Sequence, residues 1–220
     1  MLLDAGGTLF TEVEARDAVY ARVLAGYGAR VALPEMARLR AELHDAMPEV
    51  FAGAARYTDP WFREFVRRLL LHLVLPADAE EVRLRLAEHF QRAEHFVVFP
   101  DTLPALEELA ARGVRLGVVS NWSDRLGGLL EELQLSRYFE VVVASALVGA
   151  CKPHPTIFQH ALERFHAPPE RVVHVGDHPV NDLLGARRSG LAALLLDRSG
   201  EHSRDPAAIR TLEDLPRRLG

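Results

Sequence analysis

The chain has 220 residues, of which 49% are hydrophobic and 26% charged, and its formal net charge is −5. These values are ordinary for a globular protein, and they provide no clustered basic surface for nucleic acid. The apolar runs are too short to span a bilayer, and a single cysteine excludes an internal disulfide framework. With no leader segment visible before Asp4, the composition predicts a cytoplasmic protein that binds neither nucleic acid nor membrane.

The first part of the chain has the pattern of helices after a short apolar start. Residues 1–3 are fewer than the roughly five or six residues of an ordinary strand, which leaves open whether the natural chain begins upstream of Met1. Residues 12–96 are expected to be helical throughout. Proline, glycine and capping signals place helices over residues 15–27, 34–49, 58–75 and 78–90.

After Pro100, short apolar runs alternate with helical segments. Strands are expected over residues 114–120, 140–144, 171–175 and 191–196, and helices over residues 104–112, 124–134, 155–166, 180–189 and 206–219. Nearly continuous aliphatic and β-branched runs joined by helices predict a parallel sheet covered on both faces. The predicted fold class is therefore α/β. A doubly wound, Rossmann-like core of residues 1–11 and 97–220 carries an inserted all-helical domain, residues 12–96.

Polar residues follow four of the predicted strands. In a doubly wound sheet, ligands bind beyond the carboxyl ends of the strands. The residues delivered there are Asp4 and Thr8 after the first strand, Ser120 and Asn121 after the second, Lys152 after the third, and Asp177 and Asp182 after the fourth. Lys152 is the only lysine among 26 basic residues, which makes its place at a strand end more notable.

Together these groups suit phosphate chemistry. Carboxylates and a backbone carbonyl can hold Mg²⁺, which draws a phosphate oxygen toward a nucleophile and offsets repulsion between anions. Lys152 would supply a second positive charge, and Ser120 with nearby backbone N–H groups would hold the phosphate. Asp4 could then attack phosphorus and give an aspartyl-phosphate that water hydrolyses. The Gly6-Gly7 pair would let the backbone turn tightly beside the ligand.

Four segments, in this order and spacing, resemble the motifs of the haloacid dehalogenase superfamily of aspartate-nucleophile hydrolases. They are DAGGTLF (4–10), VVSNW (118–122), CKPHPTIF (151–158) and VGDHPVNDLLGAR (175–187). Within the superfamily, SNWSDRL and its flanking text resemble the group called haloacid dehalogenase-like hydrolase domain-containing protein 3. The resemblance covers the whole core and implies that residues 12–96 form a C1-type helical cap.

On the substrate side, the resemblance implies a role for each matching residue. Asp4 would be the nucleophile and Thr8 would orient the first loop. Ser120, with Asn121 beside it, would bind the transferred group, and Lys152 would steady that group and the Asp4 carboxylate. The ligand would be a small phosphorylated molecule, bound by a monomer or a homodimer.

On the metal side, the resemblance implies Mg²⁺ as the cofactor. Its ligands would be Asp4, the carbonyl of Gly6 and Asp177, and Asp182 would either join them or hold Lys152. Trp122, which follows the Ser-Asn pair, could meet either the helical domain or the substrate.

Position 6 departs from the pattern of the superfamily's phosphatases, which read Asp-x-Asp. Their second aspartate protonates the leaving oxygen and later activates water, whereas Gly6 can move no proton. Loss of such an acid–base group costs roughly 10²–10⁴ in rate. The substrate could have a leaving group that needs no protonation, or the protein could bind phosphorylated ligands with little or no turnover. A substitute acid is the remaining alternative, and the candidates are Glu12, Glu14, Asp17 and His178.

Two other reactions of the superfamily can be weighed. The 2-haloacid dehalogenases also lack an acid at position 6, but they lack the acidic pair Asp177 and Asp182, which would repel a carboxylate substrate. Phosphonate hydrolases need a cap lysine for a Schiff base, and residues 12–96 contain none. The sequence therefore predicts a phosphatase-type hydrolase. A phosphate-binding protein is the first alternative, and a 2-haloacid dehalogenase is the less favoured one.

Overall fold

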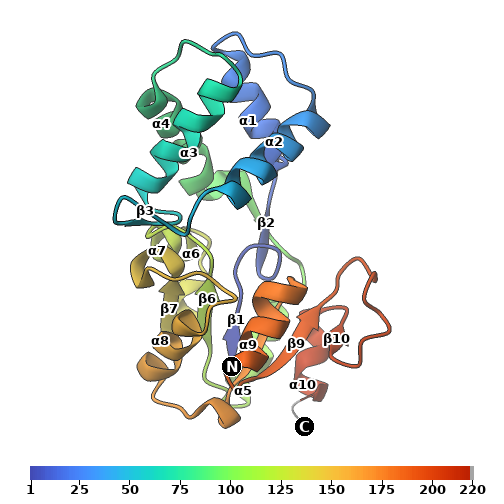
Figure 1. The fold of residues 1–220 in the computed structure, drawn as a ribbon. Coiled ribbons are helices and arrows are strands. Elements are labelled where there is room, and N and C mark those ends of the chain that lie inside the picture. The colour runs from blue at the N-terminus through green and yellow to red at the C-terminus, as the bar shows by residue number, and fades with distance from the viewer. Residues whose placement is uncertain (219–220) are drawn as a thin grey trace. The chain divides into compact units, whose positions relative to one another are not determined.

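The computed structural model describes residues 1–218 of the chain (Figure 1). The chain divides into two compact units, Met1–Thr11 with Val97–Gly220, and Glu12–Phe96. The first unit is an α/β domain, and the second consists mainly of helices. Over residues 1–218, the structure contains no helix that is long and apolar enough to cross a membrane.

A six-stranded sheet forms the centre of the α/β unit, with the strand order β10-β9-β8-β1-β6-β7. Every neighbouring pair is parallel. The strands consist largely of valine, leucine and alanine, as expected for strands buried on both faces, so the predicted α/β class is confirmed. The strands are β1 (Leu2–Leu3), β6 (Gly117–Ser120), β7 (Val141–Ala144), β8 (Val173–Gly176), β9 (Ala192–Leu196) and β10 (Ala208–Ile209).

Both faces of the sheet are covered. Leu2 and Val119 belong to a buried cluster that includes Phe158. Leu3 and Val118, the neighbours of these two residues along their strands, are also fully buried. Since successive side chains of a strand point to opposite faces, side chains are buried on both faces of the sheet. The sheet therefore exposes chiefly its strand ends, where the polar residues lie.

Short helices connect these strands. The sequence predicts a helix over residues 180–189, whereas the structure has a π-helical turn, Pro179–Leu184, which continues as α9. The helices are α5 (Thr102–Ala111), α6 (Leu126–Glu132), α7 (Ser145–Val148), α8 (Pro155–Phe165), α9 (Gly185–Arg188) and α10 (Leu215–Arg218). Helical 3-10 turns lie at Ser136–Tyr138, Pro169–Arg171 and Leu212–Asp214.

The predicted helix over residues 206–219 is wrong for most of its length. Ala208 and Ile209 instead pair with β9 and extend the sheet by one edge strand, which buries Ile209. The backbone carbonyls of Ala207 and Ile209 accept the N–H groups of Leu195 at 3.0 Å and Asp197 at 2.8 Å. These bonds to the neighbouring strand and the residue after it take the place of the local bonds of a helix. Only Leu215–Arg218 is α-helical, and residue 219 lies outside the described residues.

The helical unit packs four helices around its own core. Trp61 and Phe65 stack in that core, with ring centroids 5.9 Å apart. Asp78 caps the fourth helix, because its carboxylate accepts the backbone N–H of Glu81 at 2.9 Å. The helices are α1 (Arg16–Ala25), α2 (Leu33–Ala46), α3 (Asp59–His72) and α4 (Ala79–Gln91), and a 3-10 turn follows at Ala93–His95.

The prediction that residues 12–96 are helical throughout is wrong, because this unit also contains two short strands. Strands β3 (Val50–Phe51) and β4 (Ala54–Ala55) form an antiparallel hairpin. Its turn residues Ala52 and Gly53 both have positive φ, which the tight two-residue turns of hairpins require. The two connecting segments also pair with each other, as β2 (Phe10–Glu12) and β5 (Phe96–Val98).

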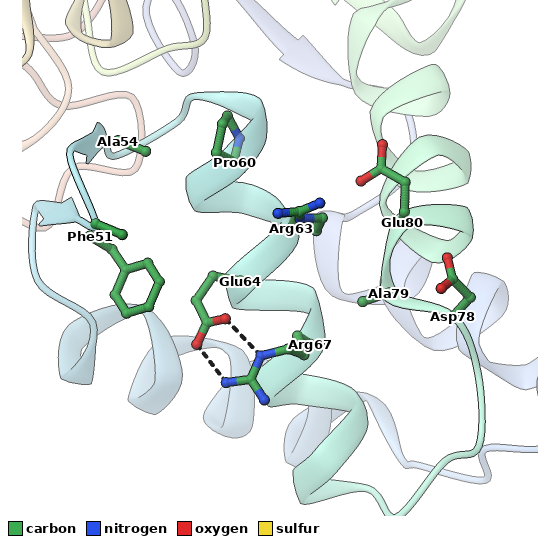
Figure 2. Close-up of a pocket in the computed structure, with 10 residues that line it drawn as sticks. Phe51, Ala54, Pro60, Arg63, Glu64, Arg67, Asp78, Ala79 and Glu80 are labelled. Carbon is green, nitrogen blue, oxygen red and sulfur yellow. Dashed lines mark hydrogen bonds and ion pairs between the residues drawn. The ribbon is translucent and has the colours of Figure 1, made fainter.

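The helical unit contains a cavity of about 430 Å³, lined by α3, the start of α4 and the β3–β4 hairpin (Figure 2). Glu64 points toward Arg67 there and accepts two hydrogen bonds from it, at 2.7 and 2.8 Å. Glu80, across the cavity, is paired with Arg83 at 2.7 Å. These carboxylates are already satisfied by protein cations, and the lining includes none of the predicted site residues.

Candidate active site

The carboxyl ends of three adjacent strands meet at one edge of the sheet. Leu3 of β1 is in register with Val118 of β6 on one side and with Val175 of β8 on the other. The residues that follow therefore leave the sheet together. The structure thus places Asp4 beside the loops that carry Ser120 and Asp177, as the predicted topology requires.

Lys152 is buried at this edge between two aspartates. Its Nζ lies 2.6 Å from Oδ1 of Asp4 and 2.6 Å from Oδ1 of Asp182, and the residue is 3% exposed. Burial alone would lower the pKa of Lys152, but the charges of Asp182 and Asp4 outweigh it and raise the pKa above its ordinary value. The ammonium is therefore a fixed positive charge at any physiological pH.

A third carboxylate, that of Asp177, lies close to the two that contact this ammonium. Asp4, Asp177 and Asp182 each place a carboxylate oxygen within 4.8 Å of the other two. Loss of hydration and the neighbouring charges of Asp4 and Asp182 raise the pKa of Asp177 to about 7. One ammonium cannot neutralise three carboxylates, and hard oxygen donors at this spacing suit a divalent cation. The residues present therefore fit a metal ion. Asp4 and Asp177 would hold it, while Asp182 is already engaged with Lys152 at 2.6 Å.

Two glycines allow the loops to approach so closely. Gly7 has a φ of +79°, and a Cβ built there would lie 2.4 Å from Oδ2 of Asp177. At Gly176, a Cβ would lie 2.2 Å from Cγ of Asp182. Real Cβ atoms do not make contacts this short, so any side chain at either position would displace a carboxylate of the cluster.

Asp182 is held by three donors. Its Oδ1 receives Lys152 Nζ and lies 2.9 Å from Nε2 of His174, and its Oδ2 accepts the backbone N–H of His178 at 3.0 Å. Burial acts to raise the pKa of Asp182, but Lys152 and His174 together lower it below its ordinary value. Asp182 is therefore a permanently ionised partner of Lys152.

Sequence reasoning missed His174. It is fully buried in the middle of β8, within the apolar run VVHVG, and it makes a side-chain contact with the site from inside the sheet. Within residues 1–218, no group bonds to its other ring nitrogen, Nδ1. A histidine in an otherwise aliphatic strand was the available signal, because such a residue needs a buried partner.

The residues predicted to bind phosphate have different surroundings. Thr8 is fully buried, and its Oγ1 has no hydrogen-bond partner among the described residues, so this hydroxyl can serve a ligand. Ser120 is buried at the end of β6. Asn121 is already engaged, since its Nδ2 donates to the carbonyl of Lys152 at 3.0 Å and its Oδ1 accepts the N–H of Lys152 at 2.7 Å. Its amide fixes the backbone from which the ammonium extends.

The four side chains considered as substitutes for an acid at position 6 all have other partners. Glu12 pairs with Arg16, Glu14 with Arg22 at 2.8 Å and Asp17 with Arg40 at 2.6 Å, all within or at the start of the helical unit. His178 caps the π-helical turn, because its Nδ1 accepts the N–H groups of Val180 and Asn181 at 3.1 Å.

A second feature missed by sequence reasoning is a clamp on the first loop. Arg198, which follows β9, donates to the carbonyl of Thr8 at 2.9 Å. Its guanidinium also makes a forked ion pair with Asp101, at 2.9 and 3.0 Å, and lies over the ring of Phe99. Asp101 in turn accepts the N–H of Leu212 at 2.9 Å. The loop that follows Asp4 is therefore tied to two distant segments of the chain.

Fold and site together define a Rossmann-like hydrolase core with an aspartate, a lysine and an acidic pair at its strand ends. A profile of haloacid dehalogenase-like hydrolases matches residues 1–190, and the chain belongs to this family. The family resemblance read from the four motifs is confirmed.

Individual relatives share this assignment. The chain is 38% identical over 149 residues to "Haloacid dehalogenase-like hydrolase domain-containing protein 3" of Danio rerio, covering 66% of this chain and 62% of that protein. It is 33% identical over 175 residues to "Phosphoserine phosphatase" of Thermus thermophilus, covering 75% of this chain and 69% of that protein. A crystal structure of a HAD phosphatase from Thermococcus onnurineus, 29% identical, superposes with a TM-score of 0.71 over 100% of this chain and 96% of that one. The chain thus spans about three fifths of the Danio rerio relative, and phosphatases are among its homologues.

Proposed function

We propose that this chain is a Mg²⁺-dependent phosphatase-type hydrolase that acts on a small phosphorylated molecule through an aspartyl-phosphate on Asp4. The observation that carries the proposal is the placement of the Lys152 ammonium, 2.6 Å from both Asp4 and Asp182. The carboxylate of Asp177 is the third of the cluster and lies close to the other two. A site built to hold two kinds of cation against a nucleophilic carboxylate is suited to a dianionic substrate.

Each residue then has a task. Lys152 holds the Asp4 carboxylate in place and offers its remaining N–H to the phosphoryl oxygens. Thr8 and Ser120 bind those oxygens with their hydroxyls, and Asn121 supports Lys152. Asp4, Asp177 and the Gly6 carbonyl would hold Mg²⁺, which when bound supplies charge neutralisation between the substrate and the carboxylates. Asp182 holds Lys152.

The reaction proceeds by two displacements at phosphorus. A carboxylate oxygen of Asp4 bonds to phosphorus, the ester P–O bond breaks, and its electron pair leaves with the ester oxygen. Water then attacks the aspartyl-phosphate, which releases inorganic phosphate, regenerates the Asp4 carboxylate and yields one proton. The helical unit, acting as a cap, is the proposed source of substrate choice.

The test is turnover of p-nitrophenyl phosphate with Mg²⁺ and with a chelator. The expected result is Mg²⁺-dependent release of nitrophenolate by the native chain and none by Asp4→Asn. The matched control is Asp45→Asn, because that carboxylate lies in the helical unit with its side chain 85% exposed. Equal inertness of the native chain and Asp4→Asn across a broad panel of phosphates refutes the enzymatic proposal.

A second candidate is a phosphate-binding protein with little or no turnover, which the absence of an acid at Gly6 favours. Beryllium fluoride, a mimic of the phosphoryl group on aspartate, separates the two. Binding of the mimic with Mg²⁺ but no turnover supports this candidate, and failure to bind the mimic removes the phosphate site from both. Halide release from 2-chloropropionate would favour a dehalogenase instead.

A further inference from the structure

Trp122 fills the space toward which a side chain at position 6 would point. A Cβ built on Gly6 would lie 3.0 Å from Cζ3 of Trp122 and 3.7 Å from its Cη2. Both atoms belong to the six-membered ring of the indole, so this ring lies directly against the backbone two residues after Asp4. The Cβ contact alone is tighter than almost all real Cβ contacts, so a side chain at position 6 requires the indole to shift.

The backbone of Trp122 is fixed by hydrogen bonds, and its ring contacts Phe10. Ser145, which is fully buried, accepts the backbone N–H of Trp122 at 3.1 Å and donates to its carbonyl at 3.2 Å. The backbone N–H of Ala146 donates to the same carbonyl at 3.1 Å. Phe10 meets the ring edge to face, with centroids 5.7 Å apart. The start of the Trp122 side chain is therefore fixed relative to α7, and a shift of the ring would break its contact with Phe10.

We propose that Trp122 is a specificity-determining residue that selects phosphate monoesters of phenols and other acidic hydroxyls with flat, apolar leaving groups. This inference rests on the proposed hydrolysis at Asp4. Two properties of the indole support it: it excludes a proton donor from position 6, and it presents an aromatic wall beside the nucleophile. An aromatic leaving group can stack on that wall, and a phenolate is stable enough to depart unprotonated.

The chemistry balances without an acid. As the Asp4 oxygen bonds to phosphorus, the ester bond breaks and its electron pair remains on the phenolic oxygen. The phenolate leaves as an anion and takes a proton from bulk water only after it departs. An alkyl phosphate would expel a far more basic alkoxide, so the missing proton donor penalises alkyl substrates most strongly.

The inference predicts that an acid restored at position 6 will not be enough by itself to raise activity. In Gly6→Asp the new Cβ meets Trp122 at 3.0 Å, so the carboxylate cannot take a productive position unless the indole yields. Removal of the indole together with addition of the acid should therefore succeed where either change alone fails. The two positions should behave as a coupled pair in a double-mutant cycle.

The experiment measures kcat/KM for phenyl phosphate and methyl phosphate in the native chain, Gly6→Asp, Trp122→Ala and the double variant. Gly6→Asp alone should gain less than about tenfold on methyl phosphate, whereas the double variant should exceed Trp122→Ala by about 10²-fold or more. Trp122→Ala should also raise KM for phenyl phosphate by about two- to twelve-fold, the range of an aromatic pair, with less effect on methyl phosphate. Trp122→Phe should restore most of that loss.

Two kinetic outcomes overturn the inference. One is a gain from Gly6→Asp alone that equals the gain in the double variant, because Trp122 would then obstruct nothing. The other is an unchanged ratio of phenyl to methyl phosphate in Trp122→Ala while inorganic phosphate still inhibits normally. Thermal unfolding and that inhibition show that each variant is folded with its phosphate site intact.

A binding measurement separates this inference from the proposed function. The chain has two tryptophans, so in Trp61→Phe the tryptophan emission comes from Trp122 alone. In this variant carrying also Asp4→Asn, phenyl phosphate should change the Trp122 emission, whereas methyl phosphate should change it little. If the native chain turns over no phosphate, the proposed function fails, and this emission change alone then decides the role of Trp122. An equal response to both ligands overturns it.

Discussion

Replacement of Asp177 by asparagine tests whether the acidic cluster is built for a cation. The pKa of Asp177 is raised from an ordinary 3.8 to about 7. Below pH 3.8 the Asp177 carboxyl is protonated in both the folded and the unfolded state. Between pH 3.8 and about 7 only the unfolded state loses the proton, so the metal-free protein loses stability as pH rises, and above 7 the full penalty remains.

The magnitude follows from the size of the shift. A displacement of about three units corresponds to about 4 kcal/mol, and because Asp177 is an exposed residue, solvent screening reduces this to about 1–2 kcal/mol. For a chain of this size, about 2–4 °C of melting temperature corresponds to each kcal/mol. In a chelator, the melting temperature of Asp177→Asn relative to the native chain should therefore rise by about 2–8 °C between pH 4 and pH 8.

With Mg²⁺ present, the native chain should instead be more stable than Asp177→Asn. At about 100 times its dissociation constant, a bound ion adds about 2.7 kcal/mol to the native chain, or about 5–11 °C, and much less to Asp177→Asn. Thermal scans of both proteins and of the exposed control Asp45→Asn, at pH 4 and pH 8 with and without Mg²⁺, measure these differences. The reasoning fails if Asp177→Asn and Asp45→Asn behave alike at both pH values and respond equally to Mg²⁺.

Three further substitutions probe the supports of the site. Lys152→Met leaves Asp182 buried beside an apolar group, so the free energy of unfolding should fall by about 3–5 kcal/mol, which a denaturant titration measures. Beryllium fluoride binding should weaken by more than about 10²-fold, which calorimetry measures. Arg198→Lys keeps the charge but loses the fork to Asp101, so kcat should fall by about tenfold while the Mg²⁺ concentration for half-maximal activity stays unchanged. His174→Leu removes a donor to Asp182 and should cost about 1–3 kcal/mol in unfolding free energy, and a cost near zero would show that this contact contributes nothing.

The larger elements of the fold were predictable because each carries its own local signal. Strands such as β7 are nearly pure valine, and α4 begins at the expected cap, Asp78. The missed elements, β2 to β5 and β10, are strands of two or three residues, too short to show a period. Their pairing depends on partners elsewhere in the chain, as Ala208 and Ile209 depend on β9.

In the candidate site, too, residues placed by the topology of the sheet were predictable, and residues placed by long-range contacts were not. Asp4, Lys152 and Asp177 were predictable because a parallel sheet brings its strand ends to one edge, whatever the loops do. His174 carried a local signal, a histidine within an aliphatic strand, but that signal did not identify Asp182 as its partner. The Arg198–Asp101 pair has no local signal, since the two residues are 97 positions apart. The roles assigned to these residues in catalysis stay predictions until the variants are measured.

The geometry also accounts for the single lysine in a chain that otherwise uses arginine. At position 152 the cation must touch Asp4 Oδ1 and Asp182 Oδ1, each at 2.6 Å, while only 3% of the residue is exposed. An ammonium is a compact charge whose three donors point in different directions, so it can serve two separate carboxylates and still face a ligand. A guanidinium is a larger, planar fork that matches one carboxylate at a time, as Arg198 does with Asp101. Between two aspartates, the smaller cation leaves more space for the proposed phosphate and metal ion than a guanidinium would.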